Sequence, residues 1–222
     1  MDALVLVVVL SPLLAAVLIG GGVLCGKLQG EASEAMTARI ANGAITLSFF
    51  MVSLLWLLNG LNKTTGTFEL SPWLSSETLE IRFSFVTQGF QLNLAAVFAL
   101  LLAVVMQFSH NYFHREVSFH RFFFMLSLFS FAILLFVLSG NTVSTLMGWV
   151  LAGLCSYLGI GHFYQRSTAT TNALRAIVTK HISDACFTVG IGLCFAWIGS
   201  LNWHDINTRF IDLPHSQITC LL

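Results

Sequence analysis

The stretch 174–198, LRAIVTKHISDACFTVGIGLCFAWI, decides the fold of this 222-residue chain. It is long and apolar enough to cross a bilayer, which needs about 20 predominantly apolar residues. Its middle nevertheless contains three ionisable side chains, Lys180, His181 and Asp184. Residues four apart share a helix face, so Lys180 can pair with Asp184, and His181 lies three residues from the same carboxylate. The stretch therefore predicts a membrane helix with a paired charge cluster in apolar surroundings.

Five further stretches have the length and composition of membrane spans. They cover residues 3–25, 40–58, 92–108, 122–138 and 143–163. The chain is 56% hydrophobic and 9% charged, with a mean hydropathy of +0.83, whereas soluble domains usually have about a quarter charged residues. We therefore predict an all-α membrane protein, a single membrane domain over 1–222 with about six transmembrane helices in lipid. The net charge of zero argues against a nucleic-acid partner.

A polar segment at 59–91 separates the second and third predicted spans. Within it, the run from Thr78 to Phe85 alternates polar and apolar residues, which is typical of a half-exposed strand. We expect a small extramembrane β-hairpin there. The tail 202–222 mixes polar and apolar residues, and we expect it to lie at the membrane interface.

Positive charge is distributed unequally between the two ends of the predicted bundle. The connections after the first, third and fifth spans contain Lys27, Arg39, Arg115, Arg121, Arg166 and Arg175, and the other end has Lys63, Arg82 and Arg209. Cytoplasmic loops are enriched in Lys and Arg. We therefore expect the first set to be cytoplasmic and both termini to lie on the outside.

Other candidate ligands favour structural interpretations. His110 and His114 have the i, i+4 spacing of a metal site, but only Glu116 lies near enough to complete a set, so we predict no metal. His162 ends the fifth span and is expected to be interfacial. The five cysteines are scattered, form no CxxC motif and are expected to be free. Gly148 is one of several small residues in the fifth span, with Ala152, Gly153 and Ser156, that would allow close helix approach.

The charge cluster in 174–198 has two interpretations. Lys180, His181 and Asp184 each respond to a neighbouring charge by gaining or losing a proton, so together they could relay protons through the membrane. Alternatively, the ion pair only fixes helix packing, or it lies near the cytoplasmic end because Arg175 begins this span. The residues alone leave both interpretations open.

The segment 108–190 resembles a known family. Its matching motifs are Phe108-Ser109-His110-Asn111-Tyr112, Arg121-Phe122-Phe123, Leu126-Ser127-Leu128-Phe129, Gly140-Asn141, Leu146-Met147-Gly148-Trp149, the run GLCSYLGIG at 153–161, Phe163-Tyr164, Ala173-Leu174-Arg175-Ala176 and Ser183-Asp184. They resemble the N-terminal part of subunit 5 (subunit L) of complex I, an antiporter-like subunit of NADH:quinone oxidoreductases that is related to Mrp-type antiporters. The serine-tyrosine-leucine block after the tryptophan is the most specific of these motifs.

The resemblance implies a membrane-arm subunit of a proton-translocating respiratory complex, with inverted repeats and helices broken at mid-membrane. It implies no redox active site and no cofactor in this chain; NADH, flavin, iron–sulfur clusters and quinone would belong to partner subunits. Other membrane-arm subunits, antiporter-like ones among them, would be its neighbours in a bacterial or mitochondrial inner membrane. Asp184 matches the family's aspartate on the sixth helix, and Arg175 stands where the family commonly has lysine. The proton-path candidates are therefore Asp184, Lys180, His181 and Arg175.

The chain also departs from this family. Val150 occupies the position of a glutamate that, in complex I members, pairs with a lysine on a later broken helix. The sequence ends at Leu222, before those later helices. The subunit could therefore be truncated, split or non-pumping. The alternative is the membrane subunit of an ion-coupled transporter, either for DAB-type inorganic-carbon uptake or for Mrp-type sodium/proton exchange.

Overall fold

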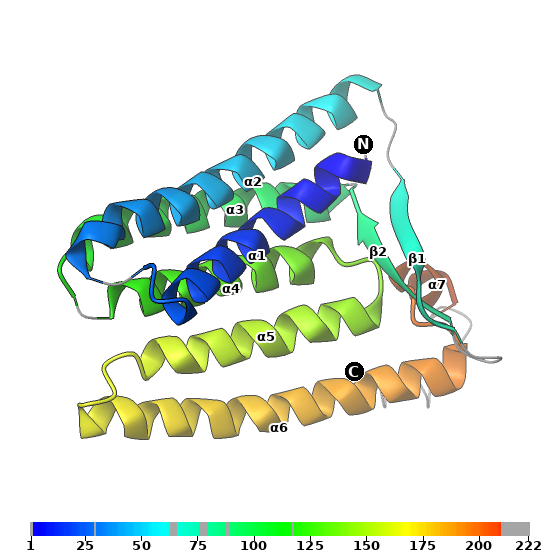
Figure 1. Ribbon diagram of the computed structural model, residues 1–222. Coiled ribbons are helices and arrows are strands. Elements are labelled where there is room, and N and C mark those ends of the chain that lie inside the picture. The colour runs from blue at the N-terminus through cyan, green and yellow to red at the C-terminus, as the bar shows by residue number, and fades with distance from the viewer. Residues whose placement is uncertain are drawn as a thin grey trace.

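The computed structural model describes residues 2–28, 30–62, 66–75, 80–87, 89–116 and 118–209 (Figure 1). Its elements are α1 (Asp2–Leu24), the short 3-10 helix η1 (Glu31–Ser33), α2 (Glu34–Asn62), β1 (Thr67–Ser75), β2 (Glu80–Val86), α3 (Gly89–Tyr112), α4 (Phe119–Leu138), α5 (Thr142–Ile160), α6 (Ser167–Ile198) and α7 (Trp203–Arg209). Among the described residues, six helices are long and apolar enough to cross a membrane. The predicted fold of six membrane helices with a hairpin between the second and third is therefore confirmed.

Helix α4 forms the centre of the bundle, and α6 forms its edge. α4 packs against α1, α2, α3 and α5, whereas α6 packs along α5 and meets α7 at its end. Figure 1 shows α5 and α6 side by side, with α6 on the outside. Half of the residues in the apolar window of α4 are buried, compared with 6% in that of α6. The outer face of α6 is thus left for lipid or for a neighbouring chain.

A proline inside α1 is accommodated by a serine on α2. Pro12 has no backbone N–H, so the carbonyl of Val8 lacks its usual helical donor. Ser48 donates its hydroxyl to that carbonyl over 2.9 Å, and the Oγ atoms of Ser48 and Ser11 are 2.7 Å apart. Backbone groups in lipid must be satisfied within the protein, so this contact fixes how α1 and α2 sit against each other.

Gly148 lets α5 approach the backbone of α4. A Cβ atom at position 148 would lie 2.7 Å from the backbone nitrogen of Phe136 and 2.9 Å from the carbonyl oxygen of Ala132. Only glycine fits such a contact, so the close approach predicted for this position is confirmed. Gly148 thus brings α5, the helix on which α6 packs, close to α4.

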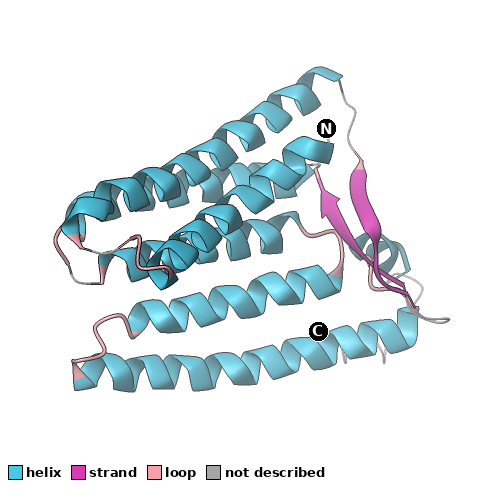
Figure 2. Cartoon of the chain, in the orientation of Figure 1, coloured by secondary structure: helices cyan, strands magenta, loops and turns pink. Residues whose placement is uncertain are grey.

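The hairpin closes one end of the bundle (Figure 2). β1 and β2 pair antiparallel, with Thr67 opposite Val86 and Glu69 opposite Ser84. The carbonyl of Ser84 accepts a hydrogen bond from the backbone N–H of Gly140, over 2.7 Å, just before α5 begins. Thr78 and Leu79, and the tail from 210 onward, lie outside the described residues.

Candidate functional site

The site predicted from the sequence is an ion pair on the face of α6 that packs against α5. The ammonium of Lys180 donates to Oδ1 of Asp184, one helical turn further on. The two side chains are 23% and 14% exposed. Because α6 begins at Ser167, ahead of the predicted start of the span, Lys180 lies about 20 Å along the helix axis. The pair is therefore near the middle of the helix and not at its start.

The other two candidates lie differently. Nδ1 of His181 is 3.8 Å from Oδ2 of Asp184, but its side chain is 69% exposed. Arg175 is exposed, and five residues along a helix turn it well away from the face that Lys180 occupies. The structure thus brings together Lys180, Asp184 and, at the rim, His181, and it leaves Arg175 apart.

Two residues of α5 surround the Lys180 side chain, and sequence reasoning had given neither a role in the site. The ammonium of Lys180 lies 4.4 Å from the ring centroid of Trp149. Gly153, one turn further along α5, faces the same side chain. Lys180 also borders a largely apolar cavity of about 340 Å³ between α4, α5 and α6. The ammonium therefore has a carboxylate on one side and an aromatic face on another.

Val150 does not face this cluster. It follows Trp149 directly, and a step of one residue rotates a side chain by about 100° around the helix. Val150 is 42% exposed and lines a separate apolar groove of about 670 Å³ between α1, α4, α5 and the hairpin. The position where the related family has a glutamate is thus apolar here and opens to a different side of α5.

The end of the bundle opposite the hairpin contains histidines with specific partners. Nδ1 of His114 is 2.9 Å from Oε2 of Glu34, and the ring of His110 packs edge-on to Phe119 at a centroid distance of 6.4 Å. Across the part of the chain that the structure describes, no three His, Cys, Asp or Glu residues are grouped to hold a metal ion. Both histidines of the i, i+4 pair therefore have protein contacts of their own.

His162 is buried in the loop after α5. Its Nε2 is 2.8 Å from the hydroxyl of Ser118, and its carbonyl accepts a hydrogen bond from Arg121 over 2.8 Å. Burial lowers the pKa of His162, the charge of Arg121 lowers it further, and Glu116 opposes the shift. His162 lies at the end of the bundle, as expected from the sequence, but its side chain is buried there and joins the α3–α4 and α5–α6 connections.

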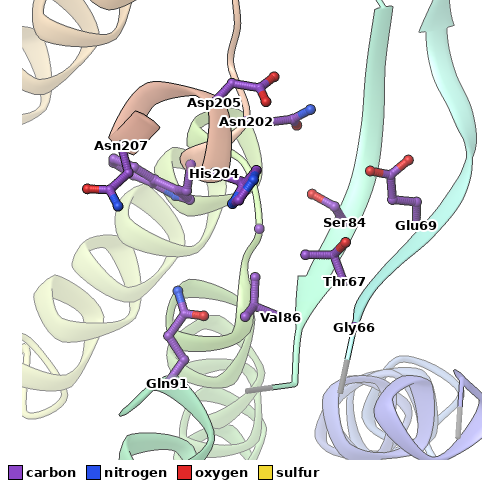
Figure 3. Close-up of a pocket in the computed structure, with 12 residues that line it drawn as sticks. Gly66, Thr67, Glu69, Ser84, Val86, Gln91, Asn202, His204, Asp205 and Asn207 are labelled. Atoms are coloured by element: carbon purple, nitrogen blue, oxygen red, sulfur yellow. The ribbon is translucent and has the colours of Figure 1, made fainter. Parts of the chain in front are cut away.

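At the hairpin end, a polar pocket of about 730 Å³ lies between the hairpin and α7 (Figure 3). Glu69 and Ser84 line it from the strands, and His204 and Asp205 line it from α7. Glu69 pairs with Arg82 over 3.6 Å, and Asp205 accepts a hydrogen bond from Ser200 over 2.6 Å. Its two acidic groups thus already have protein partners, and the pocket lies on other elements than the Lys180–Asp184 pair.

No protein-family model matches the chain, but curated proteins do. NADH-quinone oxidoreductase subunit L of Neisseria meningitidis serogroup A is 31% identical over 216 residues, which cover 96% of this chain and 31% of that protein. The chloroplastic NAD(P)H-quinone oxidoreductase subunit 5 of Nephroselmis olivacea is 31% identical over 91% of this chain and 31% of its own length. NADH-ubiquinone oxidoreductase chain 5 of Talaromyces marneffei is 26% identical over 95% of this chain and 30% of its own length. The predicted resemblance is confirmed.

The comparisons support the fold over nearly the whole of this chain, but over only part of the length of its relatives. The chain spans about a third of the length of the curated relatives it matches. A chain of the membrane-bound sulfane sulfur reductase, an archaeal respiratory membrane complex, has the same fold, with a TM-score of 0.77 over 98% of this chain and 42% of that chain at 15% identity. With six helices of spanning length, the protein is an integral, multi-pass membrane protein. Its relatives are quinone oxidoreductase subunits, so the transporter alternative is not favoured.

Proposed function

We propose that this chain acts as a membrane-arm, antiporter-like subunit of a proton-translocating NADH:quinone oxidoreductase. The observation that supports this most directly is an ion pair, Lys180–Asp184, in the middle of a membrane helix of a chain similar over nearly its whole length to such subunits. Ionisable residues within membrane helices are costly, and they usually mark ion or proton pathways. NADH, flavin, iron–sulfur clusters and quinone would be bound by partner subunits, and other antiporter-like subunits and lipid would surround this chain.

In this proposal Asp184 is the group that takes up and releases the proton. A nearby ammonium favours the charged carboxylate, and removal of that ammonium favours the carboxylic acid in apolar surroundings. The ammonium of Lys180 would therefore influence how readily Asp184 takes up a proton. His181, at 3.8 Å and exposed, would pass protons between Asp184 and a neighbouring subunit on the outer face of α6, while Arg175 adds positive charge nearer the start of the helix.

A non-pumping structural subunit is the second candidate. Val150 favours it, because the glutamate of the related family is replaced by an apolar residue that lines an apolar groove. In that case the Lys180–Asp184 pair would only help to hold α6 in place against α5.

The substitution Asp184→Asn separates the two functions. Native membranes are solubilised, the complex is isolated on a native gel, and its subunits are identified by mass spectrometry. Protons translocated per quinone reduced are then measured in vesicles. We expect Asp184→Asn to lower this ratio while the complex stays assembled, and Glu69→Gln, a carboxylate change outside the spans, to leave it unchanged. Unchanged pumping by an assembled Asp184→Asn complex would reject the proposal and support the structural role.

A further inference from the structure

The indole of Trp149 is held in one orientation by three helices. It lies on α5, its ring is 5.7 Å from that of Phe136 on α4, and it meets Phe187 of α6 edge-on at 6.0 Å. The indole Nε1 is buried and has no hydrogen-bond partner. A tryptophan whose N–H is unused but whose ring is fixed contributes mainly through its aromatic face.

That face is directed at the ammonium of Lys180. The distance from Nζ to the ring centroid is 4.4 Å, well inside the range of about 6 Å over which cation–π attraction is significant. The attraction is stronger when the cation is shielded from water, and the Lys180 side chain is only 23% exposed. Lys180 is therefore bound from two sides, by the carboxylate of Asp184 and by the ring of Trp149.

Gly153 provides the space for this arrangement. A Cβ atom at position 153 would lie 3.0 Å from Nζ of Lys180 and 3.1 Å from its Cγ. Trp149 and Gly153 are four residues apart and share one face of α5, as Lys180 and Asp184 share one face of α6. The four residues thus form a matched set across the α5–α6 contact, with a notch on one helix that receives the lysine of the other.

From this geometry we infer that Trp149 is a positioning residue for the ion pair: its aromatic face holds the Lys180 ammonium in the Gly153 notch, whether or not Asp184 is charged. An ion pair alone would release Lys180 when Asp184 became protonated. The aromatic face gives the ammonium a second, uncharged partner, so Asp184 gains and loses its proton while Lys180 stays at the helix contact. This inference rests on the proposed function for its consequence, but its geometry can be tested separately.

The geometry is tested by fluorescence of the assembled complex containing a chain in which the other four tryptophans, Trp56, Trp73, Trp197 and Trp203, are replaced by Phe. The emission of Trp149 is obtained by subtracting the spectrum of the same complex with the additional substitution Trp149→Phe, which removes the signal of the other subunits. A full charge 4.4 Å from the ring alters the emission maximum of Trp149. We expect Lys180→Met to shift that maximum, and Arg175→Met, which removes a cation elsewhere on α6, to leave it unchanged. If Lys180→Met left the emission maximum unchanged, the inference would be overturned, whether or not the complex still translocated protons.

The consequence is tested by replacing Trp149 with mono-, di- and trifluorotryptophan in the assembled complex. Fluorine withdraws charge from the ring face with little change in shape, so cation–π attraction falls step by step. We expect proton translocation per quinone to fall stepwise in the same order, with the largest loss for the trifluoro form, and fluorination at Trp56 to have no effect. Equal pumping across the Trp149 series would overturn the positioning role. Because Asp184→Asn tests the proposed function independently, the two failures can be told apart.

Discussion

Glu34, at the start of α2, and His114, just after α3, are joined by a 2.9 Å contact between Oε2 and Nδ1. The carboxylate is buried although it comes from one of the ends of the bundle, and the backbone N–H of Arg115 also donates to Oε2 over 3.3 Å. Arg115 has a φ of 66°, a left-handed conformation that non-glycine residues rarely adopt. Glu34 thus fixes both the α3–α4 connection and an unfavourable turn within it.

Replacement of Glu34 by Ala should therefore destabilise the protein. It removes the acceptor for His114 and for the Arg115 N–H, and we expect a loss of about 1–2 kcal/mol in the free energy of unfolding. Most of this loss comes from the contact with the Arg115 N–H, because the attraction between Glu34 and the exposed side chain of His114 is screened by water. Unfolding in mixed micelles measures the change. Glu31→Ala, at an exposed position three residues earlier, should have almost no effect; equal losses in the two variants would contradict this explanation.

The α1–α2 contact gives a second prediction. In Ser48→Ala the Val8 carbonyl, which Pro12 leaves without a helical donor, also loses its donor from α2. We expect a cost of about 1–3 kcal/mol, the usual penalty for a buried polar group left unsatisfied. Ser53→Ala is the matched control, since Ser53 donates to Phe49 within its own helix, where the carbonyl already has a backbone partner. If Ser53→Ala lowered the free energy of unfolding as much as Ser48→Ala, loss of any helix hydroxyl would explain the change, and the carbonyl left free by Pro12 would not.

The free energy of unfolding should also depend on pH, through His162 at the end of the bundle opposite the hairpin. Burial and Arg121 lower the pKa of His162 in the folded state, whereas in the unfolded chain it returns to about 6.5. As the pH falls below that value the unfolded state takes up the proton first, so the free energy of unfolding decreases with falling pH. His162→Phe keeps a ring among Phe113, Phe122 and Phe163 and should flatten this slope below about pH 6.5. His204→Gln, an exposed change on α7, should leave the slope in place.

Much of this architecture could be predicted from the sequence, because hydropathy and periodicity are local properties. Apolar runs located the six helices, alternation located β2, and the i, i+4 rule placed Lys180 beside Asp184. The polar run 167–173 gave no hydropathy signal, yet it extends α6 by nearly two turns and moves Lys180 away from the helix start. Helix continuity there depends on backbone bonding, which hydropathy does not report.

The surroundings of Lys180 could not be predicted in the same way. Whether Trp149 or Val150 faces α6 depends on the rotation of α5 about its axis, and that rotation is set by contacts such as Gly148 on the α4 backbone. One signal was available: Trp149 and Gly153 have the same spacing as Lys180 and Asp184. A large aromatic residue and a glycine one turn apart indicate a notch, but only the packed structure shows which side chain enters it.

That notch gives the last prediction, which compares two glycines of α5. At Gly153 an added Cβ would lie 3.0 Å from Nζ of Lys180, whereas at Gly159 it would meet nothing within 4 Å. Gly153→Ala should push the ammonium off the Trp149 ring, shift the Trp149 emission and reduce proton translocation in an assembled complex. Gly159→Ala should change neither, and it should stabilise the helix by up to about 1 kcal/mol. If Gly153→Ala left both the Trp149 emission and proton translocation unchanged, the position of Lys180 against the Trp149 ring would have no functional importance.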